Sequence, residues 1–138
     1  MAEVDINLLA VLVAAIASMI VGAVWYSPAL FAKRWLALMK KSEAELEQMK
    51  KKAPRAYALS FVGALVMSYV LAHIVDCAQA TTVAGGLESG FWLWLGFVGT
   101  TNLSGVLFED RPTGLYLINM GHYLVSLLIM GAILAVWT

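Results

Sequence analysis

Four apolar runs constrain the fold of this chain more than any other feature of its sequence. They cover residues 6–26, 57–75, 90–108 and 115–137, and none has a charged residue in its middle. The hydrocarbon core of a bilayer is about 30 Å thick, which about 20 helical residues cross. Each run therefore predicts a membrane-spanning helix. The expected fold is an all-α integral membrane protein, with a compact four-transmembrane-helix bundle as a single domain over residues 1–138.

The distribution of charge predicts how this bundle is oriented. Charged residues make up 13% of the chain and hydrophobic ones 62%, which is far more apolar than a soluble domain. Eight of the nine Lys and Arg residues lie between Lys33 and Arg55, and the ninth is Arg111. Because Lys and Arg beside membrane spans favour the cytoplasm, we expect the Lys33–Arg55 loop to be cytoplasmic and both termini to lie outside. The protein is then expected in the cytoplasmic (inner) membrane.

The cytoplasmic segment, residues 28–54, begins with a predicted amphipathic helix. Ser27 and Pro28 are residue types that favour a helix start. The apolar face that follows consists of Phe31, Trp35, Leu38 and Met39. We expect this helix to lie along the membrane interface among acyl chains, with anionic headgroups beside its cations. Those cations are Lys33, Arg34, Lys40 and Lys41. The alternative is that the first span continues past a proline kink into the cytoplasm.

The rest of this segment predicts a second, short charged helix in the cytoplasm. Ser42 and Glu45 have the spacing of a capping box, and Glu47 precedes Lys51 by four residues, which favours a helical ion pair. We expect the helix to end at Pro54, which removes a backbone donor.

Small residues recur at every fourth position of the predicted spans. Such ridges let helix backbones approach closely in a membrane, so we expect a tight bundle and, with four ridges in a short chain, a homo-oligomer. Whether the ridges meet within one chain or between chains stays open. The ridge residues are Ala10, Ala14, Ser18 and Gly22; Ser60, Ala64, Ser68 and Ala72; Gly96, Thr100 and Ser104; and Gly131 with Ala135.

Polar side chains inside the spans predict a layer in the cytoplasmic half of the bundle. At about 1.5 Å per helical residue, Asn102 of the third span lies at a height similar to Asn119 and His122 of the fourth. Ser126 follows His122 by four residues and shares its helix face. An unpartnered amide or imidazole in hydrocarbon costs several kcal/mol, so we expect these groups to face the interior. Two serines at comparable heights are further candidates, Ser18 and Ser60.

Two interpretations of this layer stay open. Asn, Ser and His side chains hydrogen-bond neighbouring helices together in many membrane proteins. Alternatively, an ionisable group such as His122 inside a membrane marks a solvated ligand site or a pathway.

Other reactive residues predict neither a metal site nor an enzyme. His73, Asp76 and Cys77 lie together near the end of the second span, but Cys77 is the only cysteine and the other histidine is expected near the opposite side. No nucleophile–base pair, paired carboxylates or phosphate-binding loop can be placed in one layer. We expect no catalytic residue, no metal and no cofactor. Nucleic-acid binding is not expected because the basic residues lie against the membrane.

The motif FEDRP, residues 108–112, predicts a tight turn between the third and fourth spans. Glu109 or Asp110 can pair with Arg111 and hold this turn together.

Several motifs in order resemble the DUF1761 family of bacterial integral membrane proteins. They are VWYSPALFAKRW, SFVGALVMSYVLA, WLWLGFVGTTNL, FEDRP and LYLINMGHYLVSLLIMGAIL. The resemblance covers nearly the whole chain and implies a four-helix membrane protein, but it brings no activity, cofactor or catalytic residue. Two positions depart from the family pattern: Ala32 stands where glycine is common, and His122 precedes Tyr123 where the reverse order is expected. The second departure moves the ring by about 100° around the helix.

Two functions are compatible with these features. The first is a non-enzymatic oligomeric binding or assembly module that packs through its small-residue ridges. The second is a small oligomeric transporter or channel whose path is lined by Asn102, Asn119 and His122. The sequence slightly favours the first, because proton-coupled carriers commonly use an intramembrane carboxylate and none is present here.

Overall fold

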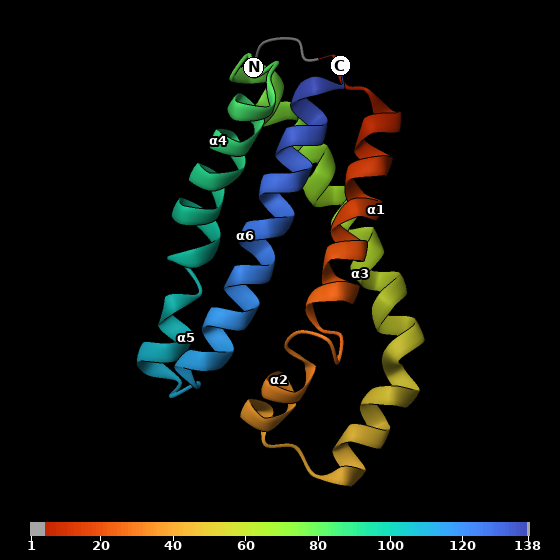
Figure 1. The fold of residues 1–138 in the computed structure, drawn as a ribbon, viewed down its shortest axis with the longest axis vertical. Helices are drawn as coiled ribbons and strands as arrows, with labels where there is room; N and C mark the ends of the chain where they lie inside the picture. The colour runs from red at the N-terminus through yellow and green to blue at the C-terminus, as the bar shows by residue number, and fades with distance from the viewer. Residues whose placement is uncertain (1–4, 138) are drawn as a thin grey trace.

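The computed structural model describes residues 5–137 and shows no strand in this part of the chain (Figure 1). The helices are α1 (Leu8–Trp25), α2 (Ala32–Met39), α3 (Glu43–Cys77), α4 (Val83–Leu93), the π-helix η1 (Trp94–Gly99), α5 (Leu103–Phe108) and α6 (Thr113–Val136). Four stretches are long and apolar enough to cross a membrane: α1, α3, Val83–Phe108 and α6. The all-helical fold and its four candidate spans are therefore as expected.

Helix α6 lies at the centre of the bundle and contacts α4, α1 and α3. Figure 1 shows it between α4 and α1. The core is formed by side chains of α1, α3 and α6: Ala10, Val11, Ala14, Leu71, Ala72, Val75, Leu127, Met130, Leu134 and Ala135. These positions all belong to the half of the bundle where α1 begins and α6 ends. The opposite half is consequently less tightly filled.

Three glycines allow α4 and α6 to approach each other closely. A Cβ atom built on Gly86 would lie 2.2 Å from the carbonyl oxygen of Gly131, and one on Gly90 would lie 2.4 Å from that of Leu127. No side chain fits at such distances. Gly86 and Gly90 are four residues apart, the spacing by which membrane helices pack backbone against backbone. The expected third span began only at residue 90 and left out Gly86, so this pair was not recognised from the sequence.

The small-residue ridges of α1 and α3 meet within the chain. Ala14 of α1 and Ser68 of α3 are completely buried, and Ser68 Oγ donates a 2.8 Å hydrogen bond to the carbonyl oxygen of Val11. Further buried ridge positions are Ala10, Ser18, Ala64, Ala72, Gly131 and Ala135. The third ridge differs, because Gly96, Thr100 and Ser104 are all exposed.

The separate charged helix expected before Pro54 does not exist. Instead, α3 runs without interruption from Glu43 to Cys77 and contains Pro54. The expected start is correct, since Ser42 Oγ accepts a hydrogen bond from the Glu45 backbone N–H. A proline inside a helix removes one backbone hydrogen bond and crowds the carbonyl four residues earlier, at a cost of about 3 kcal/mol. In a helix of 35 residues, the bonds on either side of Pro54 keep the axis continuous.

Helix α2 also differs from its expectation. It begins at Ala32, and Ser27 Oγ donates to the Val24 carbonyl oxygen rather than capping it. Its apolar face turns toward the protein: the Phe31 ring lies 4.8 Å from that of Trp25, and Trp35 lies 5.6 Å from Tyr26. These contacts place both rings against the bundle. The first span ends at Trp25, so the alternative of a helix continuing past Pro28 is wrong.

The third span is not one regular α-helix. Residues Trp94–Gly99 form a π-helix, and Thr100–Asn102 form a turn before α5 begins. The π-helix has i to i+5 hydrogen bonds, so residues after it are rotated around the axis relative to α-helical counting. This break determines where Asn102 points.

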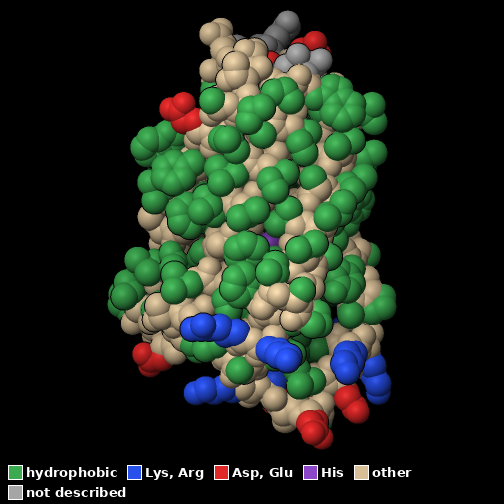
Figure 2. Space-filling view, viewed as in Figure 1, with side chains coloured by type: hydrophobic (Ala, Val, Ile, Leu, Met, Phe, Trp, Pro, Cys, Tyr) green, Lys and Arg blue, Asp and Glu red, His purple; other side chains and the backbone are tan. Residues whose placement is uncertain are grey.

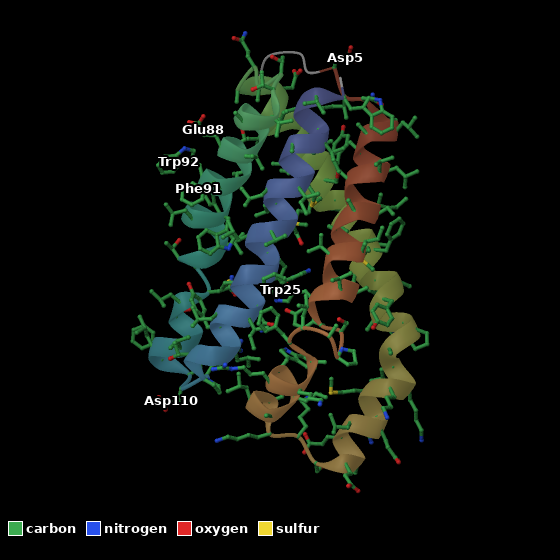
Figure 3. All side chains as sticks on the ribbon, in the orientation of Figure 1. Asp5, Trp25, Glu88, Phe91, Trp92 and Asp110 are labelled. Atoms are coloured by element: carbon green, nitrogen blue, oxygen red, sulfur yellow. The ribbon has the colours of Figure 1, made fainter. Side chains whose placement is uncertain are left out.

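Charge is concentrated at one end of the molecule. Figure 2 shows the Lys and Arg side chains gathered around α2 and the first half of α3. The start of α1 and the end of α6 lie at the opposite end of the molecule (Figure 1). Asp5 and Glu88 lie toward that end as well (Figure 3). We call the end that carries residues 33–55 the basic end.

Candidate functional site

An open cavity of about 1140 Å³ lies toward the basic end of the bundle. Its walls come from α2, the first half of α3, α5 and the first half of α6, in the half that the core leaves less filled. Apolar side chains dominate the walls, among them Leu36, Met39, Leu46, Met49, Ala53 and Leu115. Ligand pockets commonly measure about 300–1,000 Å³. The cavity thus has room for a lipid-sized molecule.

The first half of α3 forms one wall because its apolar residues share a face. Leu46, Met49, Ala53 and Ala56 follow one another at three- or four-residue intervals and all line the cavity. This is the helical period, and Leu46, Met49 and Ala53 are half-buried while the intervening charged residues are exposed. The continuation of α3 through Pro54 therefore builds the wall.

A hydrogen-bonded pair of residues contributes to the wall of the cavity. The Tyr26 hydroxyl, just after α1, donates to Asn119 Oδ1 of α6 over 2.6 Å. Both residues line the cavity. Asn119 thus faces the bundle interior as expected, and its partner Tyr26 was not among the expected polar residues.

His122 lies beside this pair but does not line the cavity. Its Nε2 occupies space that Gly22 leaves open, because a Cβ atom on Gly22 would lie 3.1 Å from it. The same nitrogen lies 3.4 Å from Ser126 Oγ, and the ring centroid lies 5.3 Å from that of Tyr26. His122 and the completely buried Ser126 therefore lie between α1 and α6, as the shared helix face predicted.

The remaining members of the expected polar layer separate into two places. Asn102 and Ser60 line the cavity together with Asn119, although Asn102 Nδ2 also donates to its own helix at the Val98 carbonyl oxygen over 2.8 Å. Ser18 is buried and donates to the Ala15 carbonyl oxygen. The structure thus brings Asn102, Ser60 and Asn119 to the cavity, but Asn102 and Ser60 are exposed rather than facing the packed interior as expected. Ser18 and His122 lie in the packed interior.

Two cations reach the cavity, and no acidic residue lines it. Lys50 comes from α3 and Arg111 from the turn before α6. Arg111 Nη2 also forms a 2.9 Å ion pair with Glu109, and both side chains are largely exposed. Exposed pairs of this kind contribute about 0–1 kcal/mol. Asp110 has a positive φ of 53°, so the turn depends on backbone conformation as well as on the ion pair.

Three aromatic side chains hydrogen-bond to the backbone of other helices or turns, and none of these contacts was expected from the sequence. Trp25 Nε1 donates to the Ile118 carbonyl oxygen (2.9 Å), and Trp94 Nε1 to that of Met120 (2.8 Å). The Tyr116 hydroxyl donates to the Gly99 carbonyl oxygen (2.5 Å). Figure 3 shows Trp25 between α1 and α6. Tyr hydroxyl and Trp N–H groups usually find a hydrogen-bond partner when they are buried. This tendency was the one feature of the sequence that could have indicated these contacts.

Metal-ligating residue types remain dispersed in residues 5–137. No three His, Cys, Asp or Glu side chains in this range are placed to hold a metal ion. The His73 ring contacts Tyr69, with centroids 4.7 Å apart, and Cys77 is exposed.

Comparison with known proteins agrees with the motifs of the sequence. The family model described as "Protein of unknown function (DUF1761)" matches residues 9–135. No curated protein and no solved structure matches the chain. The match includes all four candidate spans except the first residue of α1 and the last of α6. Because it covers nearly the whole sequence, the chain belongs to the DUF1761 family.

Proposed function

We propose that this protein is a non-enzymatic membrane binding protein whose cavity at the basic end holds an amphipathic molecule taken from the bilayer. The observation that supports this proposal is the cavity itself, with apolar walls, a volume of about 1140 Å³ and a few polar groups. Ligand sites characteristically combine such walls with a small number of oriented polar groups. We place the basic end on the cytoplasmic side of the inner membrane, following the positive-inside rule.

The rim of the cavity favours entry from the membrane. Tyr57 of α3 and Tyr123 of α6 line the cavity but are 66% and 40% exposed. They therefore lie at its opening between α3 and α6. In a bilayer this opening faces lipid, so an amphiphile can enter sideways while its polar group stays near the basic end.

Filling the cavity tests the proposal. Ala53 lines it and is half-buried, whereas Ala58 on the same helix is exposed and does not line it. In vesicles, a photoactivatable monoacylglycerol with a diazirine in its chain should cross-link to cavity residues of the wild type. We expect Ala53→Trp to reduce this labelling at least about fivefold and Ala58→Trp to leave it unchanged. Equal labelling of the wild type and Ala53→Trp would overturn the proposal.

Assembly into a homo-oligomer is a second candidate function, favoured by the exposed third ridge. A Cβ atom on Gly96 would meet nothing within 4 Å, so this side of the third span is uncovered in one chain. If copies pack there, Gly96→Leu should lower the molar mass measured by light scattering in detergent. Gly63→Leu is the matched control, since Gly63 also has open space around it but lies on α3. An unchanged molar mass for Gly96→Leu would mean that copies do not pack through this ridge.

Transport is less well supported by the arrangement of polar groups. A path along Asn102, Asn119 and His122 would need all three to line one cavity. His122 instead packs against Gly22 and Ser126.

A further inference from the structure

We infer that the cavity recognises a phosphate-bearing anionic lipid, whose phosphate lies between Lys50 and Arg111. This inference rests on the proposed binding function and adds the chemical class of the ligand. Lys50 and Arg111 are the charged side chains that line the cavity, and both are cations. They come from separate elements, α3 and the turn between α5 and α6, so two segments distant in sequence each contribute one cation to the same cavity.

Arg111 is positioned to bind an anion while keeping its ion pair. Only Nη2 contacts Glu109, and a guanidinium carries five N–H donors in a planar fork suited to phosphate oxygens. Lys50 adds a flexible ammonium group, which binds phosphate as a point charge. Neither an uncharged nor a zwitterionic headgroup offers a net negative charge to these two cations.

The remaining walls match the rest of such a lipid. Tyr57, at the rim, follows Lys50 by seven positions in α3. This spacing corresponds to about 10 Å along a helix. Met49, Ala53 and Leu115 line the space and offer apolar contact to an acyl chain that passes out between Tyr57 and Tyr123. The lipid then keeps its ordinary orientation, with the phosphate at the basic end and the chain toward the bilayer centre.

The test compares two photoactivatable probes with the same diazirine-bearing chain: a monoacylglycerol and its phosphate ester, a lysophosphatidate. In vesicles of zwitterionic lipid, we expect the phosphate ester to label the wild type at least about tenfold more strongly, which corresponds to about 1.4 kcal/mol. The variant Lys50→Gln/Arg111→Gln should lose this preference but keep the labelling by monoacylglycerol. The control Lys51→Gln/Lys52→Gln removes the same charge from exposed positions that do not line the cavity and should keep the preference.

The single variant Lys50→Gln leaves the Arg111 turn unchanged, so misfolding of that turn cannot explain its result. It should lose part of the preference for the phosphate ester. Equal preference in the double variant and the wild type would overturn the phosphate assignment while leaving the binding proposal intact. Failure of both probes to label cavity residues would instead overturn the binding proposal. Competition by millimolar inorganic phosphate would show a simple anion site and would equally overturn the lipid assignment.

Discussion

At the residue scale, the Tyr26–Asn119 hydrogen bond distinguishes the structure from a simple polar layer. The bond joins the residue after α1 to the first half of α6, and both partners line the cavity. Helical periodicity was sufficient to predict that Asn119, His122 and Ser126 face inward. It could not predict Tyr26 as the partner, because Tyr26 follows the last residue of α1, where counting along a helix no longer applies.

Removing this hydrogen bond should weaken the fold. Tyr26→Phe leaves Asn119 Oδ1 without its donor, so we expect the free energy of unfolding to fall by about 1 kcal/mol. Reversible unfolding in mixed detergent micelles measures this change. Tyr57→Phe is the control, since Tyr57 is 66% exposed, and it should change the stability little. A Tyr26→Phe variant as stable as the wild type would mean that this bond does not hold the two helices together.

Asn102 shows how far counting along a helix can go. Counting predicted its height, similar to that of Asn119 and His122, and the structure brings Asn102 to the cavity with Asn119. It could not predict the π-helix Trp94–Gly99 and the turn Thr100–Asn102, after which α-helical counting around the axis no longer applies. The exposure of the Asn102 side chain therefore did not follow from the sequence.

At the element scale, the α4–α6 pair depends on the absence of side chains. The carbonyl oxygens of Leu127 and Gly131 occupy the positions that Cβ atoms on Gly90 and Gly86 would need. The pattern Gly86-x-x-x-Gly90 was visible in the sequence, but the expected start of the span at residue 90 excluded half of it. The span begins at Val83. Polar residues such as Glu88 lower the hydropathy of the segment before residue 90, so the sequence alone indicated a later start.

Adding one methyl group should separate these helices. Gly90→Ala places a Cβ against backbone atoms that cannot rotate away, and we expect a loss of about 1–3 kcal/mol of stability. Thermal unfolding in detergent, followed by circular dichroism, measures it. Gly63→Ala makes the same change where nothing lies within 4 Å of the new atom. It should match or exceed wild-type stability, since alanine favours helix over glycine; a comparable loss in this control would contradict the backbone-contact explanation.

Helix α3 shows where local signals were right and their combination was wrong. The start at Ser42, the charged stretch and the apolar run were each identified from the sequence. Pro54 was interpreted as a helix end, yet the helix continues through it. A proline lowers helix stability without forbidding the helix, and here apolar residues on both sides of Pro54 share the cavity face and stabilise a single element.

At the scale of the whole molecule, the position of the core explains the cavity. The core cluster occupies the half away from the basic end, while α2 and the first half of α3 extend beyond the end of α1 (Figure 1). The four spans and their charge asymmetry followed directly from composition and pattern. The cavity did not, because it depends on how far apart α3 and α6 stand at one end, and sequence periodicity carries no such distance.

This arrangement predicts how water reaches each polar residue. In a Cys77→Ser chain, single cysteines replacing Asn102 and Asn119 should react quickly with a charged thiol reagent, because these positions line the open cavity. A cysteine replacing His122 should react slowly, as should one replacing the core-packed Ile133. Labelling in membrane vesicles and mass spectrometry give the rates. Rapid reaction at position 122 would favour the transport alternative over a binding cavity.

The orientation of the bundle in the membrane can be tested with two positions of α3, residues 51 and 77. Cys77 is exposed at the end of α3 away from the basic end. Lys51 lies 26 residues earlier in the same helix, which is about 39 Å and exceeds the roughly 30 Å hydrocarbon core. A thiol at residue 51 and the native thiol at residue 77 should therefore report opposite sides of the membrane. Since Lys and Arg near spans favour the cytoplasm, a membrane-impermeant maleimide added to intact cells should label native Cys77. It should label Lys51→Cys in a Cys77→Ser chain only after permeabilisation. The reverse pattern would mean that the basic end, and with it the opening of the cavity, faces outward, and the lipid would then come from the outer leaflet.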